Sequence, residues 1–396
     1  MTGTVPRIRS LDGLRGLAAV IVLISHSLMT VPVLAETHYG TERIANAGHP
    51  LWIFTYTPVH ALWAGTEAVY IFFILSGLVL ALPVLYGKTF DWLAYYPRRI
   101  TRLYLPVIAA VLLASAIVKL MPRTDDVRLG SWLVARPNDY SLMSVVQDMI
   151  LLGGVSRVVS PLWSLRWEIL FSLLLPLYIA FAKKWPSLWP VKISILVALI
   201  ALGEAISSSY LSYLPMFAIG VLFATEWTSI KKFSLVINRF RNPFIRSIAW
   251  ASLIAVAVFA LTGQWILNGI LGSSAKSLLT LPMAVTGACL LIFCAAYYPA
   301  FRNLLERSSF QWLGRISFSL YLTHEPIVIG IRFAFPHAPV AITICIGAAL
   351  SIGVAQAFFL LIESRTIIWA RSAGRVLQSL PSRRNIAPSS TGNPGS

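Results

Sequence analysis

Charged residues are scarce in this chain. Only 12% of its 396 residues are Asp, Glu, Lys or Arg, about half the share that is usual in soluble domains. Hydrophobic residues make up 57% of the chain, and its mean hydropathy is +0.75. This composition excludes an ordinary soluble domain and predicts an all-α protein that crosses a membrane several times.

Acidic residues are scarcer than basic ones. The chain has 15 Asp and Glu against 32 Lys and Arg, which gives a formal net charge of +17. An excess of this kind also occurs in proteins that bind nucleic acid. In membrane proteins, however, Lys and Arg gather in cytoplasmic loops. We therefore expect a one-sided distribution of basic residues and no nucleic-acid partner.

Cysteine is nearly absent. Cys289, Cys294 and Cys345 all lie in apolar runs, and none belongs to a Cys-x-x-Cys pair. This pattern excludes a disulfide framework and indicates small buried side chains. The chain also has no phosphate-binding glycine loop, no dinucleotide fingerprint and no spaced set of metal ligands. We therefore expect no metal.

Long apolar runs are present throughout. About ten are long enough to span a bilayer. The first run ends near Val33-Leu34-Ala35, which resembles a signal-peptide cleavage site. That run is too long for a signal peptide, so we expect the first span to be retained. We predict a transmembrane domain over 1–365 and a basic tail over 366–396 that is disordered towards its end. The predicted spans are 14–34, 61–84, 103–121, 161–182, 191–207, 210–226, 245–262, 277–297, 315–334 and 339–362.

The distribution of basic residues predicts the orientation. With ten spans and the N-terminus in the cytoplasm, 23 of the 32 basic residues fall on the inner side. This bias favours cytoplasmic N- and C-termini, and it explains the net charge without a polyanionic partner. The inner basic residues lie within 1–15, 88–102, 183–192, 231–246, 302–315 and 365–384.

Ionisable residues at membrane depth indicate function, because burying them in a bilayer is costly. His26 lies near the middle of the first predicted span, and Arg15 lies eleven residues earlier. Eleven residues make about three helical turns, so both side chains face the same way, about 16 Å apart. This suits an elongated anionic ligand that enters from the cytoplasm. A hydrogen-bonded core histidine with an ordinary topology-setting arginine is an equal alternative.

Two arginines precede the third predicted span. Arg99 and Arg102 are three residues apart, so they share one face of a helix. Paired guanidinium groups at the membrane rim suit a phosphate ligand. The alternative is a loop that is basic only because it is cytoplasmic.

A carboxylate follows in the fourth predicted span. Ser160 and Pro161 should begin this helix at the outer face, which would place Glu168 about 10 Å inward, at the depth of His26. Glu168 could then orient the imidazole across helices. A structural ion pair with Arg166 is the alternative.

A polar stripe lies in the ninth predicted span. Ser317, Tyr321 and His324 follow one another at helical spacings of four and three residues. Their side chains could line the pocket or receive the transferred group. A packing role is equally consistent with the pattern.

Together these stretches resemble the acyltransferase-3 family of integral membrane acyltransferases. Arg15 and His26 match its Arg-x10-His signature, and Glu168 ends a Trp-Ser-Leu-x-x-Glu element. The sequence departs from the family pattern at Tyr70, at the Arg166-Trp167 pair, at Ile169 and at Glu325. The matching segments are LDGLRGLAAVIVLISH (11–26), FFILSG (72–77), RITR (99–102), LWSLRWE (162–168) and ISFSLYLTHEPI (316–327).

The resemblance implies an acyl-CoA donor, acetyl-CoA above all, and a carbohydrate or glycolipid hydroxyl as acceptor. It implies that Arg15, Arg99 and Arg102 bind the CoA phosphates. His26 would act as a general base or as an acylated relay, and Glu168 would orient it. Since about 30 residues are too few for the esterase domain that some members carry, we expect a stand-alone transferase.

The expected setting is the lipid bilayer of a bacterial inner membrane. Two other functions remain open on the residues alone, a transporter with a buried charge relay and an inactive relative with a regulatory role. The sequence does not predict the oligomeric state.

Overall fold

The structure is a computed structural model, and it describes residues 8–40, 42–87, 90–124, 126–272 and 278–378. Every regular element in these ranges is a helix, which confirms the all-α fold. A helix occupies each of the ten predicted segments. These helices are α1 (Arg9–Leu28), α4 (Gly65–Tyr86), α5 (Trp92–Leu120), α8 (Leu162–Lys183), α9 (Trp189–Ala205), α10 (Ser209–Thr225), α12 (Pro243–Leu261), α14 (Thr280–Tyr297), α16 (Ser308–Ala334) and α17 (Val340–Phe358).

Fewer than ten of these helices are apolar enough to cross a membrane by composition. Eight described helices pass that test, and α10 makes a ninth when it is joined to α11 (Trp227–Asn238), from which it is bent by 76°. Helix α16 does not pass. Its residues from Ile316 to Phe333 are almost all buried in protein, so its polar side chains meet other helices rather than lipid.

Shorter helices fill the connections. Between α1 and α4 lie α2 (Pro32–Tyr39), α3 (Pro50–Tyr56) and the 3₁₀ turn η1 (Pro58–Leu62). Between α5 and α8 lie η2 (Val127–Leu129), α6 (Ser131–Val134) and α7 (Leu142–Ile150). The remaining short elements are η3 (Pro186–Leu188), α13 (Gly263–Leu271) and α15 (Pro299–Leu305). Most of these elements lie outside the predicted spans, but α2 overlaps the end of the predicted first span, 14–34, because α1 already ends at Leu28, and η1 overlaps the start of the second, 61–84.

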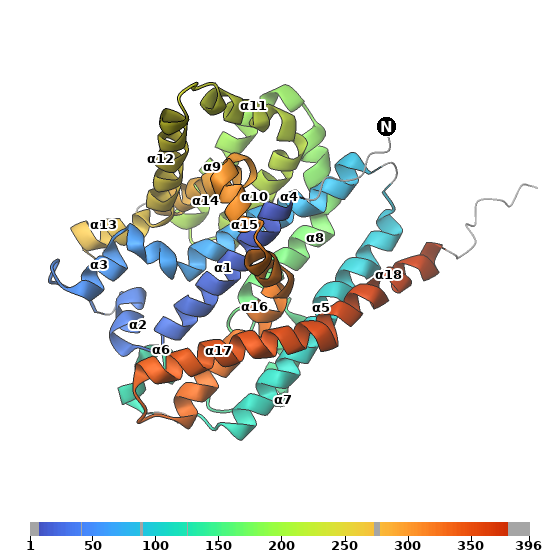
Figure 1. Cartoon of the computed structure of the whole chain (residues 1–396). Helices are drawn as coiled ribbons and strands as arrows, with labels where there is room; N and C mark the ends of the chain where they lie inside the picture. Colours follow the sequence, from blue (N-terminus) through green and yellow to red (C-terminus); the bar gives the residue numbers. More distant parts are fainter. Residues whose placement is uncertain (1–7, 41, 88–89, 125, 273–277, 379–396) are drawn as a thin grey trace, which may run out of the picture.

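Close helix contacts hold the centre together. A Cβ atom on Gly16 of α1 would lie 2.5 Å from the backbone nitrogen of Gly314 in α16. A Cβ atom on Gly77 of α4 would lie 2.1 Å from the carbonyl oxygen of Phe217 in α10. Only glycine permits backbones to approach this closely. In Figure 1, α1, α4 and α16 accordingly lie near the middle of the molecule.

The predicted tail starts as a helix. Helix α17 continues through a π-helical turn, η4 (Phe359–Glu363), into α18 (Ser364–Gln378). Figure 1 shows these three elements as one long rod, and α18 packs against α5. Residues 379–396, where disorder is predicted, lie outside the described residues.

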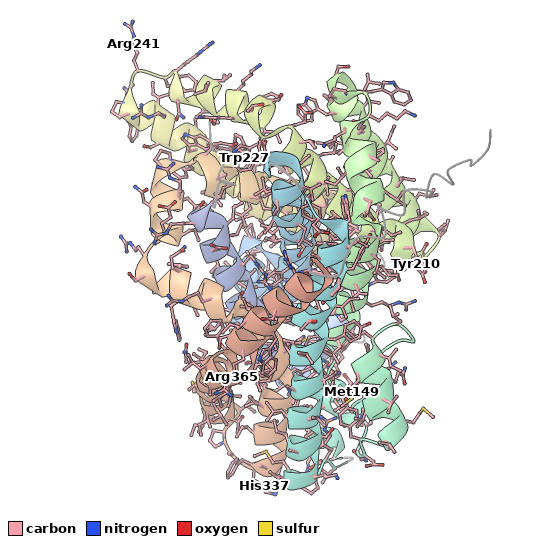
Figure 2. The ribbon with its side chains drawn as sticks, turned by 90° about the vertical axis from the view of Figure 1, so that its right-hand side faces the viewer. Met149, Tyr210, Trp227, Arg241, His337 and Arg365 are labelled. Carbon is pink, nitrogen blue, oxygen red and sulfur yellow. The ribbon has the colours of Figure 1, made fainter. Side chains whose placement is uncertain are left out.

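The two ends of the helix bundle carry different loops. Figure 2 places Arg241, between α11 and α12, at one end and His337, between α16 and α17, at the other. The sequence assigns the first of these loops to the cytoplasm and the second to the outside. We call the corresponding ends of the molecule the inner and outer ends.

Candidate active site

A cavity of about 270 Å³ lies among α1, α4, α5, α8, α16 and η4. We call it the inner cavity. Arg15, Arg99 and Arg102, the three arginines singled out in the sequence, all line it, together with Arg315. In the described part of the chain, neither Arg15, Arg102 nor Arg315 makes a hydrogen bond or an ion pair through its side chain. Three guanidinium groups therefore remain available to an anion.

The carboxylates of the inner cavity are engaged. Glu168 accepts a hydrogen bond from Arg99 at 2.5 Å and another from the Ser76 hydroxyl at 3.2 Å. Arg99 also donates to the Ser172 hydroxyl at 2.9 Å. Glu363 accepts from the Ser319 hydroxyl at 2.6 Å.

The predicted pairing of Glu168 with His26 is not found among the described contacts. Glu168 lines the inner cavity and meets Arg99, whereas His26 lines a second cavity. The side chain of Arg166 donates to the Tyr210 hydroxyl at 3.0 Å, so the alternative ion pair with Glu168 is not formed either. Counting residues along two helices estimates their depth, but two groups at one depth need not face each other.

A larger cavity, of about 640 Å³, lies towards the outer end. We call it the outer cavity. His26 lines it, and aromatic side chains form part of its wall: Tyr39, Trp132 and Trp163. Helix α1 ends at Leu28, beside this cavity, and the short helices α2 and α6 contribute residues to its wall. The cavity therefore lies beneath the outer connections rather than in the middle of the bundle.

His26 is paired with another histidine. Its Nδ1 atom lies 2.8 Å from Nε2 of His324, and the two rings are stacked with centroids 5.0 Å apart. The Nδ1 atom of His324 lies 2.8 Å from the carbonyl oxygen of Leu320. A carbonyl can only accept, so a neutral His324 carries its proton on Nδ1 and accepts on Nε2. His26 must then donate from Nδ1, and its Nε2 keeps a free lone pair.

This arrangement gives His26 the features of a general base. One ring nitrogen is held as a donor by a partner, which fixes both the tautomer and the ring orientation. The other nitrogen is unprotonated, and the side chain lines the outer cavity. His324 is fully buried and has both nitrogens engaged. Its chemistry is therefore limited to positioning His26.

Comparison with known proteins identifies the family of this chain. A family model described as "Acyltransferase domain" matches residues 8–360. The chain belongs to the acyltransferase-3 family. It is also similar to "Acyltransferase MdmB" of Streptomyces mycarofaciens, with 23% identity over 347 residues, which cover 83% of this chain and 81% of the relative. No solved structure matches.

The family assignment makes this chain an acyltransferase with membrane-spanning helices. Of the predicted site residues, Arg15, Arg99, Arg102 and Glu168 meet in the inner cavity, and His26 lies in the outer one. The late polar stripe runs between them. Ser317 lines the inner cavity and donates to the Gly314 carbonyl, and Tyr321 lines both cavities.

The sequence reasoning missed Arg136 and Trp132 at the candidate site, and it noted Glu325 as a departure from the family pattern without assigning it a partner. Glu325 accepts from the backbone and the hydroxyl of Ser160, both at 2.5 Å, and from Arg136 at 2.8 Å. The Arg136 guanidinium lies 4.5 Å over the Trp132 ring, which lies 5.9 Å from the His26 ring. Two signals pointed to Glu325: it is an ionisable residue within the predicted span 315–334, and it follows His324 directly.

This network corrects the predicted role of Ser160. Its hydroxyl is bonded to Glu325, and α8 begins without a side-chain cap. The Ser160 hydroxyl donates to the carboxylate of Glu325 in α16 instead of capping α8, because a fully buried carboxylate needs several hydrogen-bond donors. Ser160 therefore ties the start of α8 to α16 beside the outer cavity.

His38 of α2 is a further histidine of the outer cavity. Its Nδ1 atom is buried and has no hydrogen-bond partner among the described residues. Burial lowers the pKa of His38 to about 4, so the ring is neutral at neutral pH. Among the described residues, no group of three or more His, Cys, Asp and Glu side chains is arranged to hold a metal ion.

Proposed function

We propose that this acyltransferase moves an acyl group, acetyl above all, from acyl-CoA to a hydroxyl group of a cell-envelope or exported carbohydrate. The observation that carries the proposal is the His26–His324 pair, which leaves one ring nitrogen of His26, a residue that lines the outer cavity, without a hydrogen bond among the described residues. The acceptor is the outer cavity's ligand, and the donor's anionic end is the inner cavity's ligand. The protein would act in a bacterial inner membrane.

The inner cavity supports a CoA donor. CoA is an elongated molecule with phosphates at one end and a thioester at the other. Arg15, Arg102 and Arg315 offer guanidinium groups that suit phosphate oxygens. Arg99 is held by Glu168 and Ser172 and contributes positive charge at a fixed position. The slender thioester arm would extend towards His26.

The outer cavity supports a carbohydrate acceptor. Aromatic rings such as Tyr39, Trp132 and Trp163 offer flat apolar faces with polar edges, which suit the ring of a sugar. The cavity also has more room than the inner one. The relative is named as an acyltransferase, and its name gives no acceptor.

The reaction follows from the free nitrogen of His26. Nε2 removes the proton of the acceptor hydroxyl, and the oxygen attacks the thioester carbonyl carbon. A carbon–oxygen bond forms and the carbon–sulfur bond breaks. The thiolate leaves and takes the proton from His26, so the products are an ester and CoA. His324 keeps His26 oriented, because its Nε2 accepts a hydrogen bond from the Nδ1–H group of His26.

The test is acetyl transfer from labelled acetyl-CoA in membranes that contain the wild type or His26→Ala. His26→Ala should lose roughly 10²- to 10⁴-fold of the rate, the usual contribution of a general base. His337→Ala is the matched control, since His337 is an exposed histidine that lines neither cavity. Equal rates in the wild type and His26→Ala, above those of empty membranes, would remove the proposed mechanism.

A further inference from the structure

The inner and outer cavities share two side chains. Tyr321 of α16 and Val69 of α4 line both of them. Tyr321 is only 6% exposed and Val69 only 4%. A residue that borders two cavities and is itself almost inaccessible forms a thin wall between them. The two cavities are therefore separated by one layer of side chains.

Tyr321 is held in this wall by its hydroxyl group. The hydroxyl lies 2.7 Å from the Ser164 hydroxyl and 3.2 Å from the Pro161 carbonyl oxygen, both near the start of α8. The Ser164 hydroxyl also donates to the Pro161 carbonyl at 3.0 Å. Phe72 supports the tyrosine ring edge-on, with centroids 5.7 Å apart. The ring is thus fixed by contacts at its tip and along its side.

The wall lies between the groups that would act together. The available arginines are on its inner side, and His26 is on its outer side. A donor held by those arginines can bring its thioester to His26 only through the layer of Tyr321 and Val69. Rotation about χ1 moves the short side chain of a valine only a little, whereas the same rotation moves a tyrosine ring out of the path.

We propose that Tyr321 is a gate between the two cavities, tethered shut by Ser164 and Pro161 and displaced when the acyl arm passes to His26. This inference rests on the proposed function for the identity of the passing group. The closed gate keeps the donor and the solvent of one side from reaching the other. Tyr321 is then a positioning residue, because it controls the path of the thioester rather than the chemistry at its carbon.

The experiment measures passage directly, without acyl-CoA or acceptor. The parent protein carries Thr66→Cys, because Thr66 is exposed and lines the outer cavity. Cys289, Cys294 and Cys345 are replaced by alanine. A negatively charged methanethiosulfonate reagent is applied to right-side-out and to inverted membrane vesicles. The rates at which the introduced thiol at position 66 is labelled are compared for the parent and for the parent with Tyr321→Ala or Tyr321→Phe.

The parent should be labelled quickly from the outer face only. From the inner face, Tyr321→Ala should be labelled at least tenfold faster than the parent, and Tyr321→Phe, which keeps the ring but loses the tether, should fall between them. Labelling from the outer face should be equal in all three and reports correct folding. Equal inner-face rates in folded Tyr321→Ala and the parent would overturn the gate.

A second variant guards against misfolding. If Tyr321→Ala changes the outer-face labelling, Tyr321→Phe decides alone: an inner-face rate several times that of the parent supports the gate, and the parent's rate overturns it. A failed acetyl-transfer assay would contradict the proposed function, but it would not change the labelling rates that test the gate. The two failures are therefore distinguishable.

Discussion

The two histidines of the site differ in that only His26 leaves a ring nitrogen without a hydrogen bond among the described residues. His324 has both nitrogens engaged, one by Leu320 and one by His26. We expect His324→Ala to slow acetyl transfer by roughly tenfold to a hundredfold, because His26 would keep its basicity but lose its fixed tautomer and orientation. The measurement is the rate with saturating acetyl-CoA.

The control for His324→Ala is His324→Gln. Its side-chain carbonyl restores an acceptor for the hydrogen bond from Nδ1–H of His26. This variant should recover part of the rate. A His324→Ala enzyme as slow as His26→Ala would mean instead that His324 takes part in the chemistry. A wild-type rate would mean that the pair is only a packing contact.

The contact between Glu168 and Arg99 leads to a different residue-scale prediction. Because Glu168 meets Arg99 and not His26, Glu168→Gln should raise the KM for acetyl-CoA severalfold and leave the pH profile of kcat unchanged. Arg99→Ala should raise the same KM by about tenfold or more. A double-mutant cycle should give a coupling energy of roughly 0.5–3 kcal/mol.

The matched cycle pairs Glu168→Gln with His26→Gln, measured through acetyl-CoA binding. We expect no coupling there, since the two residues line different cavities. A shift in the pH profile of kcat in Glu168→Gln would show that the carboxylate acts on the imidazole, as the sequence had suggested.

His38 provides a prediction for stability against pH. Its pKa of about 4 in the folded protein lies below the usual value of about 6.5 for an unfolded histidine. Between these two values the unfolded state binds more protons, so stability should fall as the pH drops from about 6.5 to 4. The contribution of His38 is at most about 3 kcal/mol, at about 1.4 kcal/mol per pKa unit.

Thermal unfolding in detergent at several pH values in this range measures the effect. The His38→Gln variant should lose less stability on acidification than the wild type. The exposed His337, changed to Gln, should leave the wild-type slope intact. Parallel curves for the wild type and His38→Gln would contradict the prediction.

At the scale of helices, small residues at crossings decide stability. A Cβ on Gly16 would come within 2.5 Å of Gly314 and within 2.8 Å of Leu313. Gly16→Ala should therefore destabilise the protein by about 1–3 kcal/mol or more, because α1 and α16 must move apart. Gly353 of α17 has nothing within 4 Å of its Cβ position, so Gly353→Ala should be neutral or stabilising by up to about 1 kcal/mol.

Thermal unfolding of the two variants side by side tests this pair. The same chemical change is made in two helices, and only the space around it differs. Equal shifts in the unfolding temperature would mean that the α1–α16 crossing is loose enough to absorb a methyl group. Loss of folding in Gly16→Ala alone is the extreme form of the expected result.

The helices themselves could largely be predicted from the sequence. Runs of about 20 apolar residues place a helix in each predicted segment, because a spanning chain must satisfy its backbone internally. The predicted start of the third span at residue 103 was late, since α5 begins at Trp92, where Asp91 caps it. The basic residues within 98–102 interrupt the apolar pattern of α5, so hydropathy alone does not extend the predicted span back to Trp92.

The connections and the cross-helix partners could not be predicted in this way. Helices α2 and α6, which contribute His38 and Trp132 to the outer cavity, are too short to have a clear periodic signal. The spacing of Arg15 and His26 predicted two ends of one stripe, and the two residues line different cavities. That spacing carried no information about which neighbour would face His26, because this depends on how α1 packs on α16.

At the scale of the whole molecule, the two cavities lie towards opposite ends, and the arginine-lined one lies towards the end with the basic loops. The arginine-lined inner cavity lies towards the end with the predicted cytoplasmic loops, and the outer cavity lies beneath the predicted outer connections. A donor made in the cytoplasm and an acceptor presented outside would then approach from opposite sides. The proposed reaction therefore depends on which end of the protein faces the cytoplasm.

Labelling of single cysteines tests that orientation. The positions changed in Arg241→Cys and His337→Cys lie at opposite ends of the molecule (Figure 2), and with the native cysteines replaced by alanine each variant offers one reactive thiol. An impermeant thiol reagent should label the Arg241→Cys variant only in inverted vesicles and the His337→Cys variant only in right-side-out vesicles, because basic loops stay in the cytoplasm.

The control is the same pair of variants in vesicles opened with detergent, where both thiols should react. If the thiol at position 241 were labelled only from outside and the thiol at position 337 only from inside, the bundle would be inverted, and the arginines would face a compartment without CoA. If both were labelled from one side, the helices between them would not cross the membrane as α12, α14 and α16 are arranged here. Either result would remove the route from a cytoplasmic donor to His26, whatever the chemistry of that histidine.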